Sequence, residues 1–180
     1  MDLGSYFSVP NVFTREECER LIRENTKKPL QNGGVVNGTR NVRKNKMTVI
    51  EPTNDNEWIY RRISKFACDM NEKHFHFELD GKLQLIQLAL YEEGSFYDWH
   101  VDVGPSHETS CRKLSVSVQM SHGYKGGELQ FGLIDEDALT AKTDIGSATI
   151  FPSIMRHRVA QVTEGKRYSL VGWVTGPSFK

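Results

Sequence analysis

The sequence predicts a mainly β domain with supporting helices, an α+β arrangement whose strands form an antiparallel sandwich or barrel. Three observations lead to this fold class. Helical patterns are confined to the first half of the chain, short strand patterns begin near residue 82, and helical spacing does not recur between those strands. Strands at close spacing without helical crossovers pair with one another antiparallel.

Two amphipathic segments make up the helical half. Thr14 and, three residues later, Glu17 form a capping box, which predicts a surface helix that begins there and continues to about residue 28. A second helix is expected over residues 54–73, where apolar side chains recur at spacings of three and four, with Arg62 as the one polar residue among them. The expected strands are 83–91, 96–101, 113–120, 128–131, 147–151, 158–162 and 167–175.

Length and charge restrict the class of protein. The 180 residues suffice for one core, so we expect a single domain over 1–180, with helical support over 11–75 and a strand-rich core over 82–176. The 23 basic and 23 acidic residues balance, so no nucleic-acid partner is expected. The chain shows neither a secretion signal nor an apolar stretch of membrane-spanning length, so we expect a cytoplasmic protein without membrane contact.

Metal-binding side-chain types lie at the end of one expected strand. His100 and Asp102 are two residues apart, so both would point to one face of the strand and could bind one cation. A His-x-Asp pattern alone is a weak indication, because such short patterns arise by chance. His157, in the second half, is a third candidate. Two histidines and one carboxylate form the facial triad that suits iron(II) and leaves positions open for a co-substrate and dioxygen.

A candidate anion site follows His157. If residues 163–165 form a hairpin loop that ends in a left-handed glycine, Gln161 pairs with Arg167, and His157, Arg167 and Trp173 share one face. Gln161 would then lie roughly 13 Å along the strand from His157. A metal-chelated five-carbon dicarboxylate and a long arginine side chain could bridge that gap. The planar guanidinium pairs both oxygens of a carboxylate and keeps its charge when buried.

Four ordered motifs carry a family resemblance. They are YEEGSFYDWHVD at 91–102, GGELQF at 126–131, FPS at 151–153 with His157, and GKR at 165–167. In these motifs the sequence resembles the 2-oxoglutarate and iron(II)-dependent dioxygenases of the prolyl 4-hydroxylase superfamily. The arginine after the last glycine makes it most similar to the PKHD-type hydroxylases. The resemblance spans residues 83–174, about half of the chain.

The resemblance implies a double-stranded β-helix, a cupin-like jelly roll with the iron at one mouth. The residues that it assigns to the metal are His100, Asp102 and His157. Arg167 would bind the distal carboxylate of 2-oxoglutarate together with Tyr91. Tyr97 would line the pocket near the iron and Trp173 the substrate side, although each of these aromatic residues could equally be an inward-facing core residue.

The reaction implied consumes dioxygen and 2-oxoglutarate, releases succinate and carbon dioxide, and hydroxylates an unactivated C–H bond, with ascorbate as the reductant. We expect the substrate to be a prolyl residue of a peptide or protein. Two alternatives stay open: hydroxylation or demethylation of a small molecule or nucleobase, and a non-catalytic jelly-roll module that binds 2-oxoglutarate.

The stretch between the two helices, residues 31–47, is rich in glycine and in basic side chains. This composition favours a loop over a core element. Such a loop is either solvated or, over residues 33–46, a flap that closes over an extended peptide.

Overall fold

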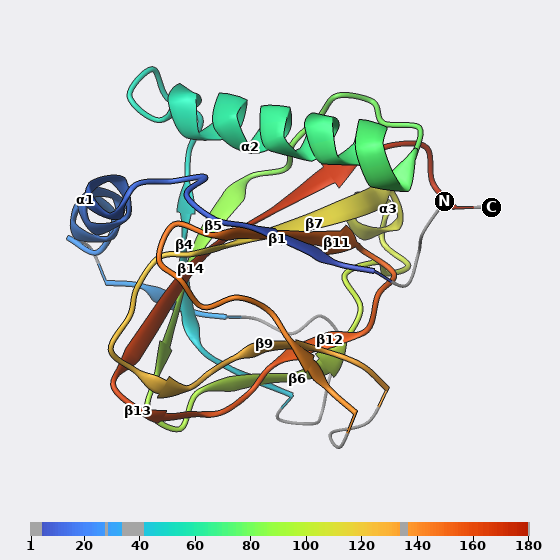
Figure 1. Ribbon diagram of the computed structural model, residues 1–180. Coiled ribbons are helices and arrows are strands. Elements are labelled where there is room, and N and C mark those ends of the chain that lie inside the picture. The colour runs from blue at the N-terminus through green and yellow to red at the C-terminus, as the bar shows by residue number, and fades with distance from the viewer. Residues whose placement is uncertain (1–4, 28, 34–41, 134–136, 180) are drawn as a thin grey trace.

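The computed structural model describes residues 5–27, 29–33, 42–133 and 137–179, whose strands form two facing antiparallel sheets and one short pair (Figure 1). The larger sheet runs, in spatial order, β1 (Phe7–Val9), β11 (Ala148–Pro152), β7 (Arg112–Gln119), β14 (Lys166–Thr175), β5 (Ile86–Glu92), β4 (Lys46–Ile50) and β2 (Gln31–Asn32). The smaller sheet runs β10 (Leu139–Thr140), β9 (Leu129–Phe131), β12 (His157–Val159), β6 (Phe96–His100) and β3 (Arg43–Lys44). The short pair joins β13 (Val162–Glu164) to β8 (Lys125–Gly126).

The main helix covers the face of the larger sheet that points away from the smaller sheet (Figure 1). It is α2 (Glu57–Met70), which continues into the π-helix η1 (Asn71–Phe75), while α1 (Arg15–Asn25) lies beside the sheet and α3 (His107–Ser110) is one turn before β7. The buried stripe of α2 consists of Ile59, Ile63, Ala67 and Met70. This stripe packs into one apolar core with the strands beneath it, so both expected helices are confirmed, with ends shifted by up to three residues.

Arg62, the polar residue within the apolar pattern of α2, attaches α1 to α2. Its guanidinium donates to the Glu17 carboxylate at 2.5 Å and lies over the Phe13 ring, 5.0 Å from its centroid. Glu17 also accepts from the backbone N–H of Thr14, which completes the predicted capping box. The first turn of α1 is therefore fixed at once by its cap and by a side chain of α2.

The two faces of the larger sheet differ in polarity because side chains alternate along each strand. On β7, the side chains that join the apolar core under α2 are Leu114, Val116 and Val118. The alternate side chains, which face the smaller sheet, are Ser115, Ser117 and Gln119. β14 repeats this pattern, with Leu170 in the core and Arg167 and Ser169 buried on the inner face. The space between the sheets therefore has a polar wall.

The expected strands are confirmed with ends within three residues, except for 158–162, which is split between β12 and β13. The predicted hairpin across residues 163–165 is wrong. Arg167 pairs with Tyr91 of β5 rather than with Gln161, and Val162 pairs with Gly126 of β8. The chain crosses from the smaller to the larger sheet at this turn, so β12 and β14 lie in different sheets. Gly165 does adopt the expected left-handed conformation, with φ +79°.

The expected basic loop is only partly a loop. Its described ends are strands, since Gln31–Asn32 pairs with β4 and Arg43–Lys44 pairs with β6. The loop prediction is wrong there, because the basic side chains of short edge strands can lie at the sheet margin while the backbone pairs. The middle of the expected flap, residues 34–41, lies outside the described residues.

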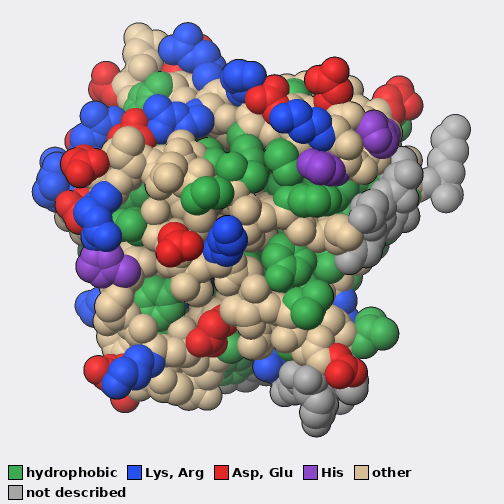
Figure 2. All heavy atoms as spheres, viewed as in Figure 1, with side chains coloured by type: hydrophobic (Ala, Val, Ile, Leu, Met, Phe, Trp, Pro, Cys, Tyr) green, Lys and Arg blue, Asp and Glu red, His purple; other side chains and the backbone are tan. Residues whose placement is uncertain are grey.

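Acidic and basic side chains are interspersed on the face shown in Figure 2, in agreement with the balanced charge. Among the described residues, no helix is long and apolar enough to cross a membrane.

We predict that Glu17→Gln destabilises the fold by about 1 kcal/mol at pH 7, because the lost charge-assisted bond is partly exposed. The hydrogen bond from Arg62 lowers the pKa of Glu17 below its ordinary value of 4.5. A lowered folded-state pKa stabilises the fold above the unfolded value, and this contribution disappears as the pH falls through the folded value. The difference between wild type and variant in urea denaturation should therefore persist from pH 7 to about pH 4.5 and shrink between there and about pH 3.

Glu19→Gln is the matched control on the same helix. Glu19 lies 4.0 Å from Arg15 with its side chain 57% exposed, so little loss is expected. An equal loss for Glu17→Gln at both pH values would contradict the assigned ion pair.

Candidate metal centre

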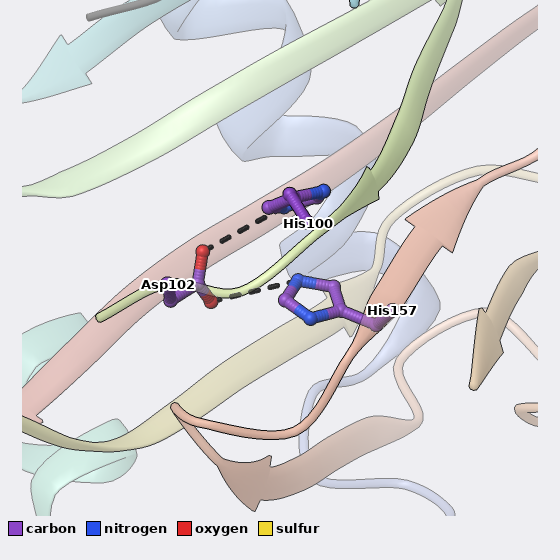
Figure 3. Close-up of side chains that lie close together, drawn as sticks. All are labelled: His100, Asp102 and His157. Carbon is purple, nitrogen blue, oxygen red and sulfur yellow. Dashed lines mark ion pairs between the residues drawn. The ribbon is translucent and has the colours of Figure 1, made fainter. Parts of the chain in front are cut away.

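The structure brings His100, Asp102 and His157 together at one mouth of the space between the sheets (Figure 3). His100 ends β6, Asp102 follows it in the next loop, and His157 begins β12, which pairs with β6 so that the two histidines lie opposite each other. One candidate ligand atom from each residue lies within 4.8 Å of the other two. The prediction that these side chains lie close together is thus confirmed.

In each histidine, the ring nitrogen Nδ1 makes a hydrogen bond to a backbone carbonyl. Nδ1 of His100 lies 2.7 Å from the carbonyl oxygen of Asp98, and Nδ1 of His157 lies 2.9 Å from that of Met155. A carbonyl can only accept, so both Nδ1 atoms carry a proton, and in the neutral imidazole it is then Nε2 that presents the lone pair. These Nε2 atoms face the Asp102 carboxylate at 3.7 and 3.6 Å (Figure 3). The tautomers are therefore those that metal binding requires.

Asp102 is held by hydrogen bonds from one side. Ser115 of β7 donates to its Oδ2 at 2.6 Å and also contacts the Ser153 hydroxyl at 2.9 Å, while the backbone N–H of Asp102 donates to the carbonyl of Ser153. These contacts fix the position of the Asp102 carboxylate between β7 and the loop after β11. Ser115 was not singled out from the sequence, although its inward position in the alternation of β7 could have indicated it.

Burial and charge set the protonation states of the site. Burial of the Asp102 carboxyl raises its pKa, but the neighbouring His157 and His100 and the hydrogen bond from Ser115 outweigh burial, so the pKa lies below its ordinary value of 3.8. Burial, followed by the neighbouring His157, lowers the pKa of His100 to about 4. At neutral pH the site thus offers an ionised carboxylate and a neutral imidazole, the forms that bind metals.

Aromatic rings restrain both histidines. Tyr97 stacks on His100 with ring centroids 3.5 Å apart, and Phe151 meets His157 edge to face at 4.6 Å. The guanidinium of Arg43 from β3 also lies over the Tyr97 ring, 4.6 Å from its centroid. Tyr97 therefore does lie beside the metal-ligand group, as predicted.

Trp173 lies beside Asp102, since it pairs with Ser115 across β14 and β7. Its indole lowers the pKa of Asp102, although the buried Nε1 makes no hydrogen bond within the described part of the chain. The guanidinium of Arg112 lies 3.8 Å from the indole centroid and donates to the carbonyl of Asp102 at 3.2 Å. Arg112 was missed from the sequence, because a basic residue at the start of a strand carries no signal that separates it from a surface cation.

Arg167 lies deeper in the same space. It is 3% exposed, its Nη1 donates to Ser169 at 3.3 Å, and its Nε is buried without a hydrogen-bond partner among the described residues. Tyr91, its partner across β5 and β14, has its ring centroid 5.5 Å from the guanidinium carbon. A buried guanidinium with an unsatisfied donor favours an anionic ligand at this position.

Residues 86–175, half of the chain, match the 2OG-Fe(II) oxygenase superfamily. The chain belongs to this superfamily, whose members use iron(II), 2-oxoglutarate and dioxygen. The arrangement fits these groups, because the three ligand atoms leave coordination positions open and Arg167 offers an unpaired donor to a carboxylate. The chain is thus an iron(II)- and 2-oxoglutarate-dependent oxygenase of the prolyl 4-hydroxylase superfamily.

Among similar proteins, a PKHD-type hydroxylase of Rippkaea orientalis is 29% identical over 172 residues, which cover 93% of this chain and 77% of the relative. A PKHD-type hydroxylase of Parvibaculum lavamentivorans is 37% identical over 93 residues, covering 49% of this chain and 41% of the relative.

Solved structures with the same fold include a Pseudomonas putida prolyl-4-hydroxylase, with a TM-score of 0.76 and 19% identity over 96% of this chain and 93% of that one. A Trichoplax adhaerens prolyl hydroxylase in complex with a hypoxia-inducible-factor peptide has a TM-score of 0.77 and 14% identity, over 96% of this chain and 84% of that one. At these identities the likeness shows the fold, which confirms the double-stranded β-helix.

We predict that Ser115→Ala weakens Mn(II) binding about tenfold, because the Asp102 carboxylate loses the donor that orients it. Isothermal titration of Mn(II) without 2-oxoglutarate measures this effect, and His157→Ala, which removes a ligand, should abolish most binding. Ser117→Ala is the matched control, since Ser117 lies on the same face of β7 two residues further from Asp102. Unchanged binding in Ser115→Ala would show that its hydroxyl does not orient Asp102.

Proposed function

We propose that this chain hydroxylates prolyl residues of a peptide or protein, with iron(II) bound by His100, Asp102 and His157. The observation that carries the proposal is the convergence of the three candidate ligand atoms within 4.8 Å, on the same interior that holds the buried Arg167. The polar inner face of β7 and β14 connects these two positions.

In this proposal the distal carboxylate of 2-oxoglutarate binds Arg167, with Tyr91 beside it. Arg167 leans toward Ser169, which is four residues before Trp173 on β14, roughly 13 Å along the strand. The side chain therefore reaches back toward the metal centre, as a bridging dicarboxylate requires. This geometry replaces the hairpin as the reason why His157 and Arg167 can act on one ligand, since both side chains are buried between the sheets, one from each sheet.

Bound together with dioxygen, iron(II) and 2-oxoglutarate would supply the oxidant that hydroxylates the substrate, with release of succinate and carbon dioxide and with ascorbate as reductant. The protein would hold the ligands in their metal-binding protonation states and exclude water from the interior. Tyr97 and Trp173 flank the ligand group on the two sheets. Aromatic faces of this kind would hold the apolar ring of a proline beside the metal.

Two further observations support the proposal of a peptide substrate. The similar sequences are PKHD-type hydroxylases, and the structural neighbours include prolyl hydroxylases, one of them in complex with a peptide. The mouth of the site also has exposed apolar side chains near Asp102, since Val101 is 45% and Ile154 37% exposed. An extended peptide could bury these side chains on binding.

We predict that Arg167→Lys weakens 2-oxoglutarate binding by about 1–3 kcal/mol, because lysine keeps the charge but loses the bidentate fork. Titration of the Mn(II)-loaded protein under anaerobic conditions would measure this loss, and Mn(II) affinity should stay at the wild-type value. Arg158→Lys is the matched control, since Arg158 follows His157 on β12 and bonds to Gln130 rather than facing the interior. Wild-type 2-oxoglutarate affinity in Arg167→Lys would refute its assigned role.

Peptides that contain proline should stimulate succinate release and gain one oxygen atom on proline, as seen by mass spectrometry of the products. His157→Ala should lack both activities. Oxidation of nucleosides or free metabolites without any peptide oxidation would reject the substrate class. Tight 2-oxoglutarate binding without succinate formation on any substrate would favour the non-catalytic alternative.

A further inference from the structure

A small cavity of about 10 Å³, the room that roughly one water molecule needs, lies beside Arg167 at the end of the interior away from the metal centre. Seven of its nine lining residues are polar, and none of these described residues is acidic: Ser117, Gln119, Tyr124, Lys142, Thr143, Thr149 and Arg167, with Leu129 and Ala141 completing the lining. A polar, cation-bearing lining without a carboxylate favours an anionic occupant.

Two donors in this lining have no partner within the described residues. The hydroxyl of Tyr124 and Nε of Arg167 are both buried and make no hydrogen bond. A buried donor without a partner destabilises the folded state, and more so when the group is charged, so unsatisfied donors are rare in native structures. Two such donors on one cavity indicate that an acceptor binds between them.

Tyr124 is held in this position by two glycines. A Cβ built at Gly127 would lie 3.2 Å from Cδ of Arg167 and 3.6 Å from Cε2 of Tyr124. A Cβ at Gly165 would lie 3.3 Å from Cα and 3.4 Å from Cβ of Tyr124. Both glycines have positive φ, so they supply the turns and also leave the space in which the tyrosine approaches Arg167. The GGEL motif thus has a packing role at this end of the interior.

We propose that the Tyr124 hydroxyl is a second donor to the distal carboxylate of 2-oxoglutarate, in addition to Arg167. This inference rests on the proposed function of the site. A phenol that donates to an ionised carboxylate forms a charge-assisted bond, and the carboxylate would satisfy both unpaired donors together. Tyr124 thereby becomes a residue that selects a 2-oxo acid with a second carboxylate over one that ends in a methyl group.

The test is the 2-oxoglutarate affinity of Tyr124→Phe, measured by anaerobic titration of the Mn(II)-loaded full chain. Phenylalanine keeps the packing against Gly127 and Gly165 but removes the hydroxyl. We expect the dissociation constant for 2-oxoglutarate to rise about tenfold to a hundredfold, as for loss of a hydrogen bond to a charged group. The affinity for 2-oxopentanoate, which has the same five-carbon chain without the distal carboxylate, should not change.

Tyr168→Phe is the matched control, because Tyr168 is adjacent to Arg167 on β14 and packs on the outer, helix-covered face. It should leave both affinities at the wild-type values. Wild-type 2-oxoglutarate affinity in Tyr124→Phe, with a weakened Arg167→Lys, would overturn this inference alone and leave the tyrosine hydroxyl a cavity-lining group. Failure of the wild-type protein to bind 2-oxoglutarate would overturn the proposed function as well.

Discussion

The larger sheet has to be apolar on the face beneath α2 and polar on the face toward the smaller sheet, and most of the site depends on this constraint. Successive side chains of one strand point to opposite faces, so a shift of one residue in the register of β7 would exchange Ser115 with Val116. The apolar core excludes such a shift, because it would bury serines beneath α2 and expose valines to the interior. The hydrophobic core therefore determines which residue of β7 reaches Asp102.

The metal-ligand group depends on contacts from both sheets. The smaller sheet supplies the two histidines through the pairing of β12 with β6, whereas the larger sheet supplies the hydroxyl that bonds to Asp102. The buried Asp102 carboxylate stays ionised because its neighbours His157 and His100 and the hydrogen bond from Ser115 outweigh the effect of burial. The site thus lies between the two sheets and takes residues from both. Any change in the distance between the sheets would change the geometry of the metal-ligand group.

The mainly β fold and the shared side of His100 and Asp102 could be predicted from local patterns, whereas His157 was a candidate through its residue type and the family resemblance. His100 and Asp102 share a side through their spacing of two, and the alternation of 113–120 marks a strand with one buried face. The path of the chain after Val162 could not be predicted from local patterns, and the predicted hairpin is wrong. Its turn carries the chain from one sheet to the other, and the partner of Arg167 is Tyr91, 76 positions earlier in the chain.

Features that depend on tertiary neighbours could not be predicted from local patterns either. Tyr124 lies in a turn whose composition indicates only a turn, and its relation to Arg167 depends on the approach of two glycines. The short strands β2 and β3 escaped prediction because their basic composition resembles a loop, and only pairing with β4 and β6 makes them strands. The metal, 2-oxoglutarate and substrate roles of the individual side chains stay predictions.

The position of β14 also has a consequence for how the chain is made. β14, the last strand along the described part of the chain, lies near the middle of the larger sheet, between β7 and β5. During synthesis on a ribosome, these two strands have unpaired edges until residues 166–175 emerge. Unpaired strand edges are templates for association with other chains. A chain that stops before residue 166 would therefore lose a central strand of the larger sheet and would expose two strand edges to aggregation.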